Sequence, residues 1–180
     1  MFKKIFFVIL FLCLGVFFGI NINSSYAVET EEEESEVVPD SVFYDWVVYY
    51  TNGKEEEKKC YIATFAKEQK GNYKEPRQPY IMISIFKEKN TEEVSVYSGY
   101  TFKIKSAIYL GIDNKQFRLM TEGDRAWAAN NDEDRIIIKE LLNAKTIKVK
   151  GETISGEYTI DTYSTDGIAR AYNKMQELCK

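Results

Sequence analysis

The chain of 180 residues has no histidine, only three cysteines and only three prolines. The absence of histidine excludes Ser-His-Asp and Cys-His catalysis and histidine-based metal sites. Neither a G-x-x-x-x-G-K nor a G-x-G-x-x-G loop occurs, so the common phosphate-binding motifs are missing. The 24 basic residues against 28 acidic ones give a net charge of −4. This balance argues against nucleic acid as the main partner, because phosphate binding needs a basic face.

The one long hydrophobic run lies at the N-terminus. Lys3 and Lys4 precede an almost unbroken apolar stretch from Ile5 to Ile20, and small residues flank Tyr26 further on. This three-part pattern predicts a secretory signal peptide that is cleaved after Ala27, so that the mature chain begins at Val28. The alternative is an uncleaved membrane anchor, although the run is a little short for a span of about 20 residues.

Composition then divides the chain into three parts. Residues 1–27 form the expected signal peptide, and residues 28–42 are glutamate-rich and are predicted to be a flexible acidic tether. Residues 43–180 are predicted to form a single domain, which is long enough to bury a core. Loss of the two signal lysines leaves 22 basic and 28 acidic residues, a net charge of −6.

Cysteine use points to an oxidising compartment. Cys13 leaves with the signal peptide, and Cys60 and Cys179 remain as one even pair. In an exported chain such a pair predicts a single intramolecular disulfide, with two free thiols or an intermolecular bond as the alternatives. A catalytic cysteine is not expected, because no imidazole can act as its base.

Hydrophobic periodicity predicts a mainly β fold. Short runs alternate apolar and polar residues, and Asn131 to Ala144 changes to a helical stripe behind a capping asparagine and three acids. A second helix is expected after Ser164. The predicted fold is an antiparallel β-sandwich with two short helices, one of them C-terminal. The expected strands are 43–51, 58–66, 80–86, 94–97, 100–105, 108–112, 117–119, 147–150 and 158–161.

Few residues suggest chemistry, and we predict no catalytic residue, no cofactor and no metal site. Arg125 and Trp127 follow a turn and could form a partner-binding patch, since both types are enriched at binding hot spots. The favoured alternative is that Trp127 fills the core. Five aspartates lie near turns or aromatic residues, where capping and turn formation explain them best: Asp124, Asp132, Asp134, Asp161 and Asp166.

Several short motifs, taken in order, resemble the invasion associated locus B family of alphaproteobacterial exported proteins. They extend from about Phe43 to Cys179 and comprise Tyr44-Asp45-Trp46, Lys59-Cys60-Tyr61-Ile62-Ala63, Pro79-Tyr80-Ile81-Met82-Ile83, Val94-Ser95-Val96-Tyr97-Ser98-Gly99-Tyr100, Ala126-Trp127-Ala128, Val149-Lys150-Gly151 and Asp161-Thr162-Tyr163-Ser164 with Gly167. Many members carry another cysteine shortly after the Asp-Trp pair, where this chain has Val47 to Tyr50. The resemblance therefore implies the reduced pairing of Cys60 with Cys179.

The resemblance also implies a non-enzymatic β-sandwich protein of the periplasm, outer surface or medium of a Gram-negative bacterium. The family is associated with entry into host cells, so the expected partner is a host-cell surface or a component of the bacterial envelope. A membrane contact is expected only through the signal segment, if it stays uncleaved. Two other functions stay open: a periplasmic module that binds an envelope component or assists assembly, and a hydrolase that uses a pair of carboxylates.

Overall fold

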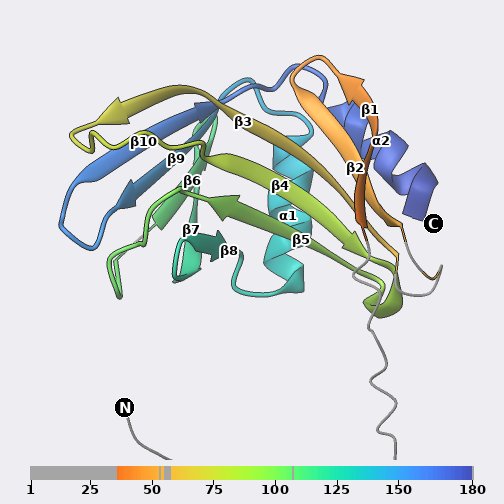
Figure 1. Cartoon of the computed structure of the whole chain (residues 1–180), viewed down its shortest axis with the longest axis horizontal. Coiled ribbons are helices and arrows are strands. Elements are labelled where there is room, and N and C mark those ends of the chain that lie inside the picture. Colours follow the sequence, from red (N-terminus) through yellow and green to blue (C-terminus); the bar gives the residue numbers. More distant parts are fainter. Residues whose placement is uncertain (1–35, 53, 55–57, 107, 180) are drawn as a thin grey trace, which may run out of the picture. The chain divides into compact units, whose positions relative to one another are not determined.

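A computed structural model describes residues 36–52, 54, 58–106 and 108–179 (Figure 1). The predicted signal peptide, its cleavage site between Ala27 and Val28, and residues 28–35 lie outside the described residues. Within the described part, neither helix is long and apolar enough to cross a membrane.

The described residues form ten strands, two α-helices and one short 3-10 turn. The elements are β1 (Glu36–Phe43), β2 (Trp46–Asn52), β3 (Lys59–Gly71), β4 (Tyr80–Phe86), η2 (Lys87–Lys89), β5 (Thr91–Tyr97), β6 (Ile108–Ile112), β7 (Lys115–Glu122), β8 (Arg125–Trp127), α1 (Asn131–Leu141), β9 (Ile147–Glu152), β10 (Tyr158–Tyr163) and α2 (Ile168–Cys179).

The strands form one antiparallel sheet that closes on itself. Its order is β1-β2-β3-β10-β9-β6-β7-β8-β5-β4, and the additional pairing of β3 with β4 joins eight strands into a barrel. The hairpin of β1 and β2 lies outside this ring and pairs with the first half of β3. The mainly β content and the two helices, one C-terminal, are confirmed, whereas the predicted β-sandwich is wrong.

The length of β3 explains the difference between sandwich and barrel. This strand of 13 residues pairs with β2 and β4 through its first half and with β10 through its second half. One strand thus joins two groups of strands that a sandwich would keep apart. Side chains alternate between the inner and outer face in both architectures, so the alternation along each strand does not distinguish them.

Residues 36–42, expected to be part of the flexible tether, instead lie in β1. Val37 and Val38 pair with Thr51 and Tyr50 of β2, and the register shifts between Pro39 and Ser41. The β-branched side chains favour this strand, and their signal was masked by the acidic composition around them. The described part of the predicted tether is therefore ordered sheet.

The predicted strand at 100–105 is also wrong. Tyr100 and Phe102 are buried, but Phe102 makes only an isolated bridge to Thr153. Ile104 is 76% exposed and Lys105 has a φ of 63°, so the chain turns here. The apolar alternation that suggested a strand instead belongs to a loop that inserts two aromatic rings into the barrel.

Helix α1 covers a gap in the barrel wall. The side chain of Asn130, one residue before the predicted cap, accepts from the backbone N–H groups of Asp132 and Glu133. Because β8 has only three residues, the start of β5 lacks a strand partner on that side, and α1 packs there (Figure 1). The carboxylate of Asp134 accepts a hydrogen bond from the Val94 N–H at 2.8 Å. The buried Asp134 carboxylate thus accepts the hydrogen bond that the carbonyl group of a neighbouring strand would accept in a continuous sheet.

Helix α2 packs against β1, β2, β3 and β4. Gly167, with a φ of 98°, precedes it, and a Cβ there would lie 1.9 Å from the Phe43 carbonyl oxygen, so no other residue fits without backbone movement. At the other end of α2, Cys179 forms a disulfide with Cys60 of β3, which is the predicted pairing. Trp46 is fully buried and donates from Nε1 to the Ser164 carbonyl, 3.1 Å away.

A buried ion pair crosses the barrel interior. The guanidinium of Arg77, in the loop between β3 and β4, donates to both carboxylate oxygens of Asp161 on β10, at 2.7 and 2.5 Å. The two side chains are only 4% and 2% exposed. Arg77 also donates to the Ser98 carbonyl at 3.0 Å. Burial raises the pKa of Asp161 and the hydrogen bonds from Arg77 oppose that rise, so ionisation of Asp161 depends on Arg77.

We predict that replacing Cys60 and Cys179 together by alanine lowers the free energy of unfolding by about 2–5 kcal/mol, because the bond closes a loop of 119 residues in the unfolded chain. Urea unfolding with and without a reductant measures the loss. The reductant should leave the midpoint of the double variant unchanged. Equal midpoints for the oxidised and reduced wild-type protein would contradict the prediction.

We predict that Arg77→Met lowers the free energy of unfolding by about 3–5 kcal/mol, because it leaves the Asp161 carboxylate buried without its partner. Lys67→Met is the matched control, since Lys67 pairs with Asp45 at the surface and its side chain is 56% exposed. The control should cost less than about 1 kcal/mol. Similar losses for the two variants, followed by tryptophan fluorescence in urea, would show that the buried pair is no more important than a surface pair.

Candidate functional site

The two residues singled out as a partner-binding patch lie on the outer face of β8. Ala126 between them is fully buried, so Arg125 and Trp127 point away from the core. Trp127 is half-buried and hydrogen-bonds the carboxyl group of Glu93. The favoured expectation that Trp127 fills the core is therefore wrong, and Trp46 has that role.

Arg125 borders a hollow with a volume of about 630 Å³ on the outer face of β2, β3 and β4. We call this hollow the aromatic groove, and its main lining residues are Val47, Tyr49, Tyr61, Ala63, Phe65, Tyr80, Met82 and Arg125. Their neighbours along the strands, such as Val48, Ile62 and Ile81, are fully buried on the other face. The aromatic groove therefore lies on the side of the sheet opposite the core and α2.

Strand register sets the shape of the aromatic groove. Val47, Ala63 and Met82 are opposite one another across three strands and form a floor of mostly small side chains. On one side of this row, Tyr49 and Tyr61 stack with ring centres 5.0 Å apart. These two rings make one aromatic wall.

The opposite wall is longer. Phe65 meets Tyr80 edge to face at 5.9 Å, and Tyr80 stacks on Tyr97 of β5 at 5.0 Å. The guanidinium carbon of Arg125 lies 5.7 Å from the ring centre of Tyr80 and 5.4 Å from that of Tyr97. These distances are within the range of cation–π attraction, so the rings position the charge at the end of the wall.

The charged side chains around the aromatic groove differ in whether they have an ionic partner. Asp45 pairs with Lys67 at 2.6 Å, and hydrogen bonds from Lys67 and then Ser164 lower the pKa of Asp45. Arg125 has no carboxylate within salt-bridge distance among the described residues. Burial, followed by the neighbouring tyrosines, raises the pKa of Tyr61, so its phenol stays neutral at pH 7 and can donate a hydrogen bond.

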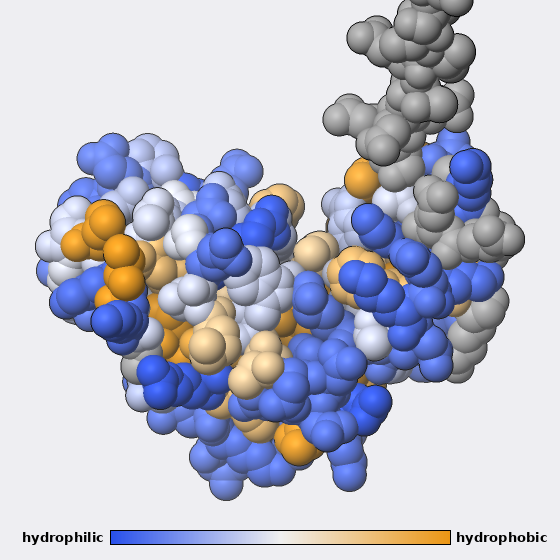
Figure 2. Space-filling model, turned by 90° about the horizontal axis from the view of Figure 1, so that it is seen from below, coloured by the Kyte–Doolittle hydropathy of each residue, from blue (hydrophilic) through white to orange (hydrophobic). Residues whose placement is uncertain are grey.

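The surface beyond the aromatic groove is less distinctive. Figure 2 shows the molecule from below, where hydrophilic residues predominate and hydrophobic residues form separate patches.

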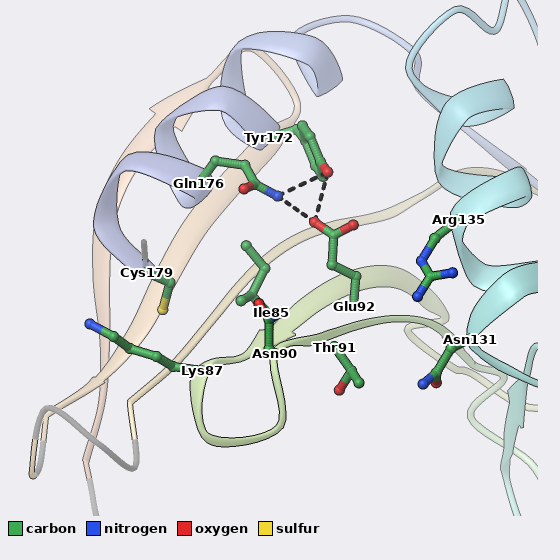
Figure 3. Close-up of a pocket in the computed structure, with 10 residues that line it drawn as sticks. All are labelled: Ile85, Lys87, Asn90, Thr91, Glu92, Asn131, Arg135, Tyr172, Gln176 and Cys179. Carbon is green, nitrogen blue, oxygen red and sulfur yellow. Dashed lines mark hydrogen bonds between the residues drawn. The ribbon is translucent and has the colours of Figure 1, made fainter.

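A second cavity, of about 490 Å³, lies between α1, α2 and the turn from β4 to β5 (Figure 3). Glu92 accepts hydrogen bonds from the Tyr172 hydroxyl, at 2.7 Å, and from the Gln176 amide, which also donates to Tyr172. Burial, and then the contact with Glu92, raises the pKa of Tyr172. Arg135 at the opposite wall donates to Asp132 at 2.6 Å. Glu92, Tyr172, Gln176 and Arg135 therefore already have partners within the chain.

Carboxylates elsewhere have structural partners. Asp161 is held by Arg77, and Asp134 accepts from the backbone of β5. Asp132 pairs with Arg135 in the first turns of α1. The described residues contain no group of three or more histidine, cysteine, aspartate or glutamate side chains placed to hold a metal ion. The hydrolase alternative therefore gains no support from Asp132, Asp134 or Asp161.

Sequence reasoning singled out Arg125 but none of the other residues that line the aromatic groove. Aromatic residues recur on the outward-facing positions of three strands: Tyr49, Tyr61, Phe65 and Tyr80. This recurrence is the sequence signal that could have predicted an aromatic surface. The strand 80–86 was predicted, but its nearly continuous apolar sequence gave no sign that Met82 is only half-buried and contributes to the floor.

Comparisons with known proteins agree with this architecture. A model of the family described as "Invasion associated locus B (IalB) protein" matches residues 46–176, more than half of the chain. A crystal structure of invasion associated protein B from Bartonella henselae superposes with a TM-score of 0.54 at 12% identity. The alignment covers 78% of this chain and 97% of the Bartonella chain, and at that identity it shows a shared fold. The search of curated proteins gives no match. The match from the first residue of β2 into α2 shows that the chain belongs to the invasion associated locus B family.

Proposed function

We propose that this protein is an exported, non-enzymatic envelope protein that supports bacterial entry into, or interaction with, host cells through protein contact. Membership of the invasion associated locus B family is the observation that carries this proposal. The signal-peptide pattern at the N-terminus supports export. The disulfide between Cys60 and Cys179 is consistent with an oxidising compartment.

The aromatic groove is the surface best suited to such a contact. Its walls present tyrosines and a phenylalanine, and Phe65 is 58% exposed. Arg125 lies beside them without a carboxylate partner among the described residues. Tyrosine and arginine contribute disproportionately to binding energy at protein interfaces, because a large rigid surface is buried at a small cost in conformational entropy.

Location is the first test. We predict that protease treatment of intact cells removes the protein, or that the medium contains it, with the mass of a chain that begins at Val28 and lacks two hydrogens because of the disulfide. Intact-mass analysis of the released and retained fractions measures this. Protein that resists protease until the outer membrane is opened would contradict surface exposure and favour the periplasmic envelope-binding or assembly role.

Host-cell entry is the second test. We predict that deleting the gene reduces entry, and that a copy with Arg125→Glu fails to restore it, because the change reverses the charge at the end of the aromatic groove. Arg118→Glu is the matched control, since Arg118 is an exposed arginine on the neighbouring strand β7 and is not part of the groove. Equal exported amounts of both variants are required. Normal entry by the deletion strain would refute the host-cell role.

A further inference from the structure

We propose that the aromatic groove binds an extended, proline-containing peptide segment that carries an acidic residue beside Arg125. The inference rests on the proposed function, because it assumes that the partner is a protein. It specifies the conformation, composition and charge of the peptide segment that is bound. The argument depends on the dimensions of the groove, on the pairing of its strands and on its charge.

The dimensions suit a chain in the polyproline II conformation. The walls rise from Tyr61 and Phe65, four residues apart on β3, which at about 3.3 Å per residue separates them by roughly 13 Å. The floor crosses strands about 4.8 Å apart, so from β2 to β4 it extends for roughly 10 Å. A polyproline II segment rises about 3.1 Å per residue, and about three of its residues therefore cover the floor.

Backbone pairing excludes a different mode of peptide binding. At the level of the groove, β3 is paired on one edge with β2 and on the other with β4, and β4 is paired with β3 and β5. The floor therefore has no free backbone edge to which a ligand could add as a strand. The ligand must be held by side chains, as in the aromatic-lined grooves that recognise proline-rich segments.

The side chains of the groove match this chemistry. Proline rings pack against aromatic faces, and a polyproline II backbone leaves its carbonyl groups without internal hydrogen bonds. The phenol groups of Tyr49, Tyr61 and Tyr80 lie beside the floor, and each carries an O–H that can donate a hydrogen bond. Ala63 in the centre of the floor leaves room between the walls.

The charge of Arg125 favours an acidic residue in the bound peptide. Arg125 is held over Tyr80 and Tyr97 and has no salt bridge within the described part of the chain. At the other end, Asp45 is already neutralised by Lys67. A ligand carboxylate beside Arg125 therefore meets an unpaired cation, whereas a ligand lysine would be repelled.

A glycan is the main competing ligand, and the lining residues disfavour it. Among the described residues, the groove is lined by no asparagine, glutamine or glutamate side chain, and the one carboxylate in this part of its lining, Asp45, is bonded to Lys67. Sugar hydroxyls would therefore find few of the bidentate polar partners that orient them. The peptide remains the ligand that the observed side chains favour.

The test uses the full exported protein, oxidised, and a fluorescein-labelled heptapeptide of six prolines around one central aspartate. We expect saturable binding in fluorescence anisotropy. Tyr80→Ala should weaken it about tenfold or more, since it removes the ring shared by two contacts. Tyr80→Phe should retain most of the affinity, which separates loss of the ring from loss of the fold. Tyr158→Ala, which removes a 54% exposed tyrosine on β10, is the matched control and should bind normally.

Arg125→Ala tests the charge. It should weaken binding of the aspartate peptide several-fold and remove the preference for that peptide over one with lysine at the centre. Arg118→Ala should have no effect on either. Equal binding of a peptide in which glycine replaces every proline would overturn the proposal. So would binding of chitohexaose, lost in Tyr80→Ala, in a protein that ignores the proline peptide.

These results are independent of the host-cell assays. Peptide binding by a protein confined to the periplasm would keep the inference about the groove and reject the host-cell role. Normal dependence of entry on the gene, with no peptide binding, would reject the inference and keep the role.

Discussion

The buried pair of Arg77 and Asp161 is the interaction on which the closed sheet depends. It fastens the loop between β3 and β4 to β10, at the place where β3 leaves one set of partners and joins another. A charge pair this deep stabilises only when both partners are present, because each alone would be a desolvated charge. Tyr80, which directly follows this loop, pairs with Phe65 in the middle of β3, and the two rings form one wall of the aromatic groove. An interior ion pair therefore helps to position the rings of the aromatic groove on the outer face.

Local signals were sufficient for parts of the fold. Helix α1 was predicted from a capping asparagine and an apolar stripe, and the pairing of Cys60 with Cys179 was predicted from an even count of cysteines in a chain expected to be exported. Closure of the sheet could not be predicted, because it depends on the pairing of β3 with β10, whose residues are about 90 positions apart. Alternation along a strand predicts which side chains share a face of the sheet. It does not predict which strand is the hydrogen-bonded neighbour.

The candidate site shows the same limit. Arg125 was singled out because it follows a turn and lies two residues before a tryptophan, but its neighbours Tyr80 and Tyr97 come from other strands. Each tyrosine alone looked like an ordinary surface residue of a β protein. Only the register between strands places Tyr49 against Tyr61 and Phe65 against Tyr80, and that register is a property of the whole sheet.

Strand β1 carries a further consequence. Within the described residues it is the end strand of the ten-stranded sheet and pairs only with β2, whereas every other strand pairs with at least two neighbours. Pro39 provides no N–H to a neighbouring chain, the register shifts beside it, and Asp40 faces Lys174 of α2 at 3.9 Å. These features obstruct the addition of another strand. A protein built so largely from β-structure can thus accumulate to high local concentration with a reduced tendency to polymerise through its sheet.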